Sequence, residues 1–379
     1  MGMIFRHFFM LGWICFGGPA AHVGYFKRHF VDKLVWLDEA KFANQLALCQ
    51  FLPGPTSSQL GFAIGYHRAG IRGAMAAFIG FTFPSFLLMY LLAVFGSIWS
   101  EAIWFNLIVD SLKLLAVVVV ADAIISMSKS FCSTITLKLI AFLSAATLII
   151  FPSAVWQVLL LLIFGGYGYL SSHIPADKTL KLSVNWRWVA VFLLVFITLI
   201  SVATQSINLN IVKQLYLSGS LVFGGGHVVL PLLQTSFSDM VSLPEFMTGY
   251  GFAQMVPGPM FSFASYLGAM AWQGSALLGA IVATVTIFTP GFLLFLATVN
   301  TWNEITSHPR IRLAVQYLTA CVVGILLAAW VTPIITQTIN SGLEVILSIL
   351  GFILLRLLKW HLLLVAFFIT GAKIIEFIV

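Results

Sequence analysis

Clusters of glycine and proline interrupt an otherwise apolar sequence, and they are the places where this chain could do chemistry. Pro53-Gly54-Pro55 is followed by three hydroxyl residues, and the cluster recurs 204 residues later as Pro257-Gly258-Pro259. A helix that begins after such a break has unpaired amide N–H groups and the positive end of its dipole at its first turn. That arrangement binds anions without a buried Lys or Arg, and glycine lets the backbone approach the ligand closely. The pattern predicts an oxyanion site made of backbone amides.

A second kind of break, Phe16-Gly17-Gly18-Pro19, recurs 207 residues later as Phe223-Gly224-Gly225-Gly226. His22 and His227 each lie within a turn of one of these breaks. Such a histidine is either a proton-sensitive donor to the anion or a packing residue with a backbone partner. We favour packing for His22 and leave both readings open for His227. The predicted substrate-binding residues are Gly17, Gly18, Pro19, His22, Pro53, Gly54, Pro55, Thr56, Ser57, Gly224, Gly225, Gly226, His227, Pro257, Gly258 and Pro259.

Other polar residues near the breaks have two readings each. The hydroxyls of Thr56 and Ser57 either hydrogen-bond the anion or cap their helix. Gln50 and Gln254 occupy matching positions and either fix a turn or face the anion, and we favour the structural role.

Proton coupling would need a titratable group near the breaks, and His227 and Asp122 are the candidates. Asp110 and Lys113 are three residues apart on the same apolar run as Asp122, and they read as an interfacial ion pair. The four cysteines lack CxxC spacing, so we expect no metal site, no disulfide framework and no cofactor.

Composition decides the class of protein. Of 379 residues, 60% are apolar and only 8% are charged, which excludes a soluble enzyme, a nucleic-acid-binding domain and a disordered scaffold. In such a protein, the excess of Lys and Arg behind the net charge of +7 indicates cytoplasmic loops rather than an acidic partner. The first apolar run leads into a Gly/Pro cluster instead of a small-residue cleavage site, so no signal peptide is expected. The chain is predicted to be a multi-pass protein embedded in a lipid bilayer.

The chain is a tandem duplication. Besides the two breaks, Pro84-Ser85-Phe86-Leu87-Leu88 recurs as Pro290-Gly291-Phe292-Leu293-Leu294, a shift of 206. Three near-equal shifts in the same order predict a first repeat at 1–170, a linker with one transmembrane helix at 171–210, and a second repeat at 211–379.

Run lengths separate full crossings from half crossings. The short runs of 11–13 residues, about half a bilayer each, lie at 4–16, 20–30, 42–52 and 56–66. Each pair reads as a hairpin that enters the membrane and leaves on the same side; the alternative is a kinked, continuous helix. Runs long enough to cross lie at 71–99, 107–126, 134–151, 154–170, 186–204, 275–299, 313–335, 343–358 and 360–378.

Loop charges favour re-entry. Bases cluster at the ends of the first-half hairpins, whereas the matching 238–246 loop holds Asp239 and Glu245 without any base. Since bases favour the cytoplasm, the halves have opposite orientations, which requires the broken segments to return to their starting side. We therefore predict an all-α polytopic membrane protein with two inverted-topology repeats and re-entrant broken hairpins, whose site lies near the midplane.

These motifs resemble those of the chromate ion transporter family in its long, two-domain form. The similarity rests on Phe16-Gly17-Gly18-Pro19 with His22, on Pro53-Gly54-Pro55-Thr56, and on their second-half versions. The resemblance implies a secondary transporter of the bacterial inner membrane that exports chromate and confers resistance to it.

Several alternatives stay open. Sulfate is a similar tetrahedral dianion, and a passive anion channel would use the same helix termini. A homodimer is compatible with the sequence. An enzyme acting on lipid phosphates is disfavoured, because the turns carry no carboxylate or guanidinium.

Overall fold

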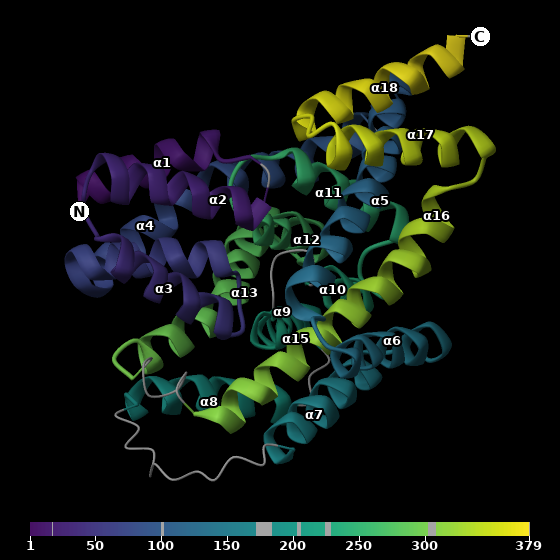
Figure 1. Ribbon diagram of the computed structural model, residues 1–379. Helices are drawn as coiled ribbons and strands as arrows, with labels where there is room; N and C mark the ends of the chain where they lie inside the picture. The colour runs from purple at the N-terminus through teal and green to yellow at the C-terminus, as the bar shows by residue number, and fades with distance from the viewer. Residues whose placement is uncertain are drawn as a thin grey trace.

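The computed structural model describes residues 1–16, 18–99, 102–171, 184–202, 206–223, 229–301 and 308–378, and its regular structure there is helical (Figure 1). The first half contains α1 (Gly2–Ile14), α2 (Gly18–Phe26), α3 (Glu39–Phe51), α4 (Thr56–Trp99), α5 (Ile103–Phe131), α6 (Ile135–Ile150) and α7 (Ala154–Leu170). After α8 (Trp186–Ser201) come α9 (Ile207–Leu221), α10 (Val229–Phe237), α11 (Leu243–Met255), α12 (Phe263–Ala271), α13 (Ala276–Thr298), α15 (Pro309–Ala329), α16 (Thr336–Thr338), α17 (Gly342–Phe352) and α18 (Leu362–Ile378).

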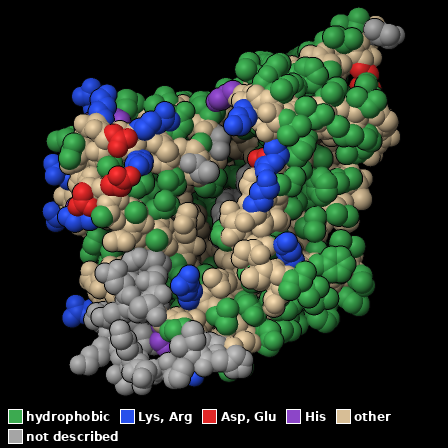
Figure 2. Space-filling view, viewed as in Figure 1, with side chains coloured by type: hydrophobic (Ala, Val, Ile, Leu, Met, Phe, Trp, Pro, Cys, Tyr) green, Lys and Arg blue, Asp and Glu red, His purple; other side chains and the backbone are tan. Residues whose placement is uncertain are grey.

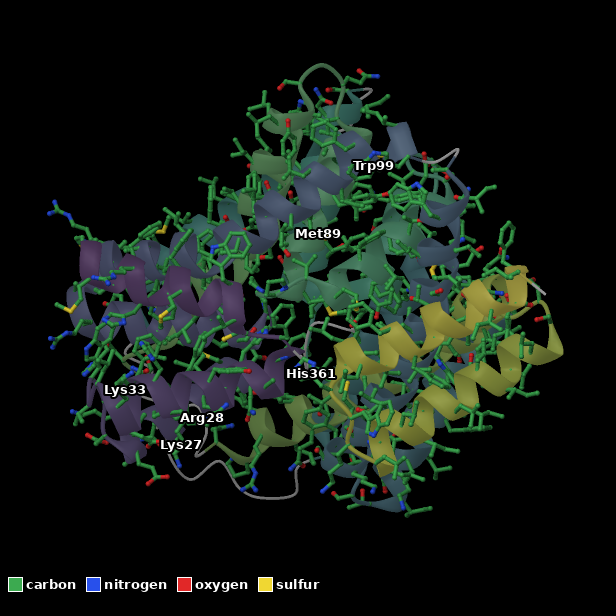
Figure 3. All side chains as sticks on the ribbon, turned by 90° about the horizontal axis from the view of Figure 1, so that it is seen from above. Lys27, Arg28, Lys33, Met89, Trp99 and His361 are labelled. Carbon is green, nitrogen blue, oxygen red and sulfur yellow. The ribbon has the colours of Figure 1, made fainter. Side chains whose placement is uncertain are left out.

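Large apolar side chains cover the outside of the molecule. Ile135 and Phe142 on α6 are 72% and 64% exposed, and Phe367 on α18 is 71% exposed. Figure 2 shows this apolar surface, with Lys, Arg and acidic side chains gathered over the helices at the amino-terminal end. Lys27, Arg28 and Lys33 lie together there (Figure 3). Outward apolar faces suit lipid rather than water, as the composition predicts.

In the described parts of the chain, three stretches are long and apolar enough to cross a membrane, by length and composition: Thr56–Gly96, Ala276–Thr298 and Pro309–Thr338. The first of them is bent sharply. Ala69 and Gly70 depart from helical geometry, Gly70 with φ +60°. A Cβ on Gly65 would lie 2.4 Å from the carbonyl oxygen of Gly73. The chain therefore folds back between a short helix that ends near residue 68 and a long one, as the separate runs at 56–66 and 71–99 predict.

The broken segments form antiparallel hairpins. In the first, Phe8 of α1 stacks on Phe30 with ring centroids 4.7 Å apart, and the ring nitrogens of His7 and His29 lie 3.0 Å apart. Residues early in α1 thus face residues late in the second arm. The two arms therefore run antiparallel, which the arms of a kinked, continuous helix would not do.

The hairpin of α11 and α12 has the same form. The Tyr266 hydroxyl donates to the Glu245 carbonyl oxygen at 3.0 Å, and Tyr250 packs edge-on against Phe263. The start of α11 is fixed by a capping box, in which Ser242 and Glu245 satisfy each other's backbone N–H groups.

The two halves exchange their last helices. α6 and α7 pack on α15 of the second half, whereas α17 and α18 pack on α5 of the first. The earlier helices pack within their own halves, α1 on α4 and α9 on α13. In Figure 1, α9, α10 and α12 lie in the middle of the molecule, with α1 and α2 on one side and the pairs α6–α7 and α17–α18 on the other.

Candidate functional site

The first proline-glycine-proline turn is held by the other half of the chain. Leu52 is extended, and Gly54 has φ +124°. The Gly54 amide donates to the Val222 carbonyl oxygen at 2.7 Å, just after the end of α9. α4 begins at Thr56, and the side chains of Thr56, Ser57 and Ser58 are 7%, 4% and 2% exposed. The free amides of this first turn and its three hydroxyls are therefore enclosed in protein.

The second turn repeats this geometry. Gly258 has φ +98°, and its amide donates to the Cys15 carbonyl oxygen at 2.9 Å, just after the end of α1. Here the chain continues as a 3₁₀ turn, Met260–Ser262, before α12 begins. The Ser262 hydroxyl donates to the Pro259 carbonyl oxygen at 2.7 Å, so that it serves the turn rather than a ligand.

These two hydrogen bonds are reciprocal. Gly54 corresponds to Gly258 by the 204 shift, and Cys15 corresponds to Val222 by the 207 shift. The same pair of positions is therefore joined in both directions, as at an isologous interface. Each turn thus lies beside the break of the opposite half.

The two turns also contact matching positions on the long helices. A Cβ on Gly54 would lie 3.0 Å from the Cα of Gly291 on α13, and one on Gly258 would lie 3.0 Å from the Ser85 hydroxyl on α4. Ser85 and Gly291 are the residues that correspond by the 206 shift. Positive φ and close neighbours explain why only glycine fits at both turns.

Gln59 is a part of the first turn that sequence reasoning missed. Its side chain is fully buried, and its Nε2 donates to the Pro53 carbonyl oxygen at 2.9 Å and to the Gly291 carbonyl oxygen at 3.1 Å. Gln59 therefore joins the turn to α13. The available signal was its position one helical turn after Pro55, but the second half has Phe263 there, so the repeat gave no support.

His22 has the backbone hydrogen-bond partner that is expected of a packing histidine. The ring is 1% exposed, and its Nε2 lies 3.2 Å from the Cys15 carbonyl oxygen, which also accepts from Gly258. Its Nδ1 has no hydrogen-bond partner among the described residues. His22 thus fixes the first break from within its own hairpin. Gly18, with φ +78°, opens α2, and Pro19 follows it.

The remaining predicted site residues divide into three groups. Gln50 is exposed, whereas Gln254 is buried and hydrogen-bonds Tyr250. Pro53 and Pro55 flank Gly54 in the first turn, and Pro257 and Pro259 flank Gly258 in the second. Gly17, Gly224, Gly225, Gly226 and His227 lie outside the described residues.

Asp122 does not stand alone. Its carboxylate pairs with the Arg356 guanidinium, which also donates to the Ser126 hydroxyl at 3.0 Å. The two charged side chains are 33% and 22% exposed. Lys113 donates to Asp110 at 3.0 Å, as the interfacial ion pair predicts. No group of three His, Cys, Asp or Glu residues in the described parts of the chain could hold a metal ion.

We expect Asp122→Leu to lower stability by about 1–3 kcal/mol, because it leaves the Arg356 charge unpaired in apolar surroundings. The double variant Asp122→Leu/Arg356→Leu should recover most of that loss. The measurement is the thermal midpoint of detergent-solubilised protein by fluorescence-detected size exclusion. A double variant that is as stable as the wild type, yet takes up anion without any dependence on a pH gradient that the wild type shows, would instead assign Asp122 to coupling.

Known transport proteins are similar to this chain over most of its length. The family model described as Chromate transporter matches residues 2–169 and 209–374. An uncharacterized transporter of Methanocaldococcus jannaschii is 26% identical over 96% of this chain and 91% of that protein. Chromate transport proteins of Cupriavidus metallidurans and Pseudomonas aeruginosa are 24% and 23% identical, over 97% and 92% of this chain and 90% and 86% of those proteins. No solved structure matches.

The chain belongs to the chromate transporter family, because the family model covers both of its halves. Together with the apolar helices and their outward apolar faces, this makes it a multi-pass membrane protein.

Proposed function

We propose that this member of the chromate transporter family carries chromate, bound where the two proline-glycine-proline turns meet the breaks of the opposite halves. The pair of reciprocal hydrogen bonds, from Gly54 to Val222 and from Gly258 to Cys15, carries the proposal. On this proposal, the amino end of α4 and the 3₁₀ turn that leads into α12 both contribute to one shared binding region. The positive ends of the helix dipoles favour an anion there.

The surroundings of the turns support a dianion held by dipoles. No charged residue occurs in the sequence between Lys41 and Arg68 or between Glu245 and Glu304. The buried hydroxyls of Thr56, Ser57 and Ser58 lie at the amino end of α4, and that of Ser58 has no partner in the described structure. These hydroxyls could donate to a tetrahedral oxyanion beside the free amides.

The proposed mechanism is secondary transport by inverted repeats in the bacterial inner membrane. The hairpins enter from opposite sides and return, so that the shared region lies near the midplane. A dianion that leaves a cell with a negative interior gains roughly 4.6 kcal/mol per 100 mV, at about 2.3 per charge. Export and resistance therefore follow without a further energy source unless the outward gradient is steep.

The deciding experiment is uptake of labelled chromate and sulfate into inverted membrane vesicles, with membrane potential and pH gradient imposed separately. We expect saturable chromate uptake driven by an interior-positive potential. Stronger sulfate uptake would keep the site and change the substrate. Uptake that does not saturate would indicate a passive channel, and no uptake of either anion would refute the proposal.

The inverted orientation predicts which loops face outward. A cysteine at Ser242 should react with an impermeant maleimide from outside intact cells, and a cysteine at Arg28 should react only after permeabilisation. Both positions are exposed, and all four native cysteines are buried, so the background should be low. Labelling of both positions from the same side would contradict inverted repeats.

A further inference from the structure

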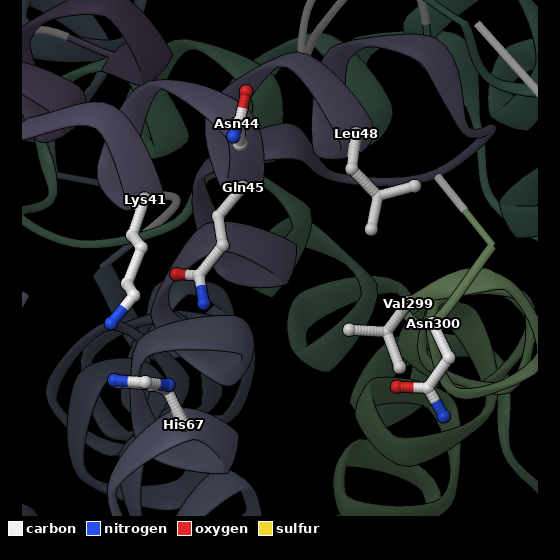
Figure 4. Close-up of a pocket in the computed structure, with 7 residues that line it drawn as sticks. All are labelled: Lys41, Asn44, Gln45, Leu48, His67, Val299 and Asn300. Atoms are coloured by element: carbon white, nitrogen blue, oxygen red, sulfur yellow. The ribbon is translucent and has the colours of Figure 1, made fainter. Parts of the chain in front are cut away.

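A polar cavity of about 260 Å³ lies between α3, the bend of α4 and the end of α13 (Figure 4). Its polar lining consists of one cation, one imidazole and three primary amides, and none of the residues that line it carries a carboxylate. These groups offer many N–H donors and only amide and imidazole acceptors, which suits an oxyanion. The polar lining residues are Lys41, Asn44, Gln45, His67 and Asn300.

The side chains converge on the cavity. Figure 4 shows Lys41, Gln45 and His67 turned toward one another, with Asn300 on the opposite wall. The Gln45 side-chain oxygen is buried without a hydrogen-bond partner among the described residues. An amide oxygen accepts hydrogen bonds, so a water molecule rather than the oxyanion would satisfy it, and the amide N–H groups remain for the anion.

Both walls of the cavity lead to the first turn. Leu48 lines its apolar floor on α3, in the last turn of that helix before it ends at Phe51 and the chain enters the first turn. Val299 lines it at the end of α13, about 12 Å of helix rise from Gly291. Because Gly54 and Gly291 touch, the cavity lies on the outward continuation of the proposed chromate site.

The second half has no equivalent of the cation. The residue that corresponds to Lys41 by the 204 shift is Glu245, whose carboxylate belongs to the capping box of α11. The cavity is therefore a feature of one end of the molecule. Lys41 also pairs with Asp38, which does not line the cavity, with Nζ 3.5 Å from its carboxylate, so a bound anion would compete with an exposed ion pair.

We infer that this cavity is a peripheral oxyanion-binding site at the Lys41 end of the molecule. It passes the anion on to the turn-lined site, and this role in loading rests on the proposed function. Lys41 supplies the charge and the amides supply the directed hydrogen bonds. On the proposed orientation, this end faces the cytoplasm, where an exporter takes up its substrate.

Binding is tested with sulfate, by its protection of a cysteine placed at Asn44 in purified full-length protein. Sulfate should slow maleimide labelling of Asn44→Cys several-fold. Lys41→Gln should remove the protection, and Lys33→Gln, which changes an exposed base of the same end outside the cavity, should keep it. Protection that survives Lys41→Gln would overturn the inference, and so would its absence in the parent.

Transport gives the second measurement. Lys41→Gln should raise the KM for uptake from this end about five- to tenfold at low salt with kcat unchanged, and the difference should shrink at high ionic strength because salt screens exposed charges. An equal rise for Lys33→Gln would overturn the assignment to the cavity. Sulfate protection without any transport by the wild type would refute the proposed function alone. Normal transport without sulfate protection of the cysteine at position 44 would refute the peripheral site alone.

Discussion

Replacing Gly54 by valine should abolish chromate uptake, with a loss of at least about 100-fold, while the protein still inserts into the membrane. Gly54 has φ +124°, which strains any side chain, and its Cβ would lie 2.9 Å from Gln59 Nε2 and 3.0 Å from the Cα of Gly291. The turn would have to move away from α13 and from the amino end of α4. Since the proposed site uses backbone amides, such a displacement removes the binding groups themselves.

Gly274→Val separates this effect from backbone strain in general. Gly274 also has positive φ, +104°, but nothing lies within 4 Å of the place of its Cβ. We expect it to retain uptake in inverted vesicles at matched expression, and Gly258→Val to lose uptake as Gly54→Val does. Normal uptake by both turn variants would dismiss the site assignment.

Gln59→Glu should reduce oxyanion binding by at least about 1,000-fold. The substitution preserves the shape of the side chain but puts a negative charge beside the first turn, where Nε2 now donates to two carbonyl oxygens. Two unit charges 4 Å apart interact with about 4 kcal/mol at an effective dielectric constant of 20, and a dianion doubles this repulsion.

Gln157→Glu is the matched control, because Gln157 is 5% exposed and lies on α7, where its Nε2 donates to the Thr235 hydroxyl instead of to a turn. Both variants bury a carboxylate, so both should lose some stability, but only Gln59→Glu should lose uptake per folded molecule. Equal losses of uptake after correction for folded protein would show that Gln59 acts only through folding.

The sequence was sufficient to predict where the first long apolar stretch divides into two helices. The short run at 56–66 and the long run at 71–99 are separated at Ala69 and Gly70, as their lengths indicate. Glycine, proline and apolar run length are local signals, and helix boundaries depend mainly on local signals.

Contacts between residues far apart in the sequence could not be predicted in the same way. Three contacts join residues more than 160 positions apart: the hydrogen bond from Gly54 to Val222, the hydrogen bond from Gln59 to Gly291, and the ion pair of Asp122 with Arg356. Such contacts follow from how helices of one half pack on the other. Nothing in a single sequence states that packing, and Gln59 has no repeat counterpart to draw attention to it.

The reciprocal bonds also bear on how a protein of this kind arose. A chain with only the first repeat would have the amide of Gly54 but not the carbonyl oxygen of Val222, and the carbonyl oxygen of Cys15 but not the amide of Gly258. A second copy of the same half would supply both missing groups at once. An ancestral half-length subunit could therefore work as a symmetric pair. Fusion of two genes would then let one copy keep a lysine where the other acquired a glutamate.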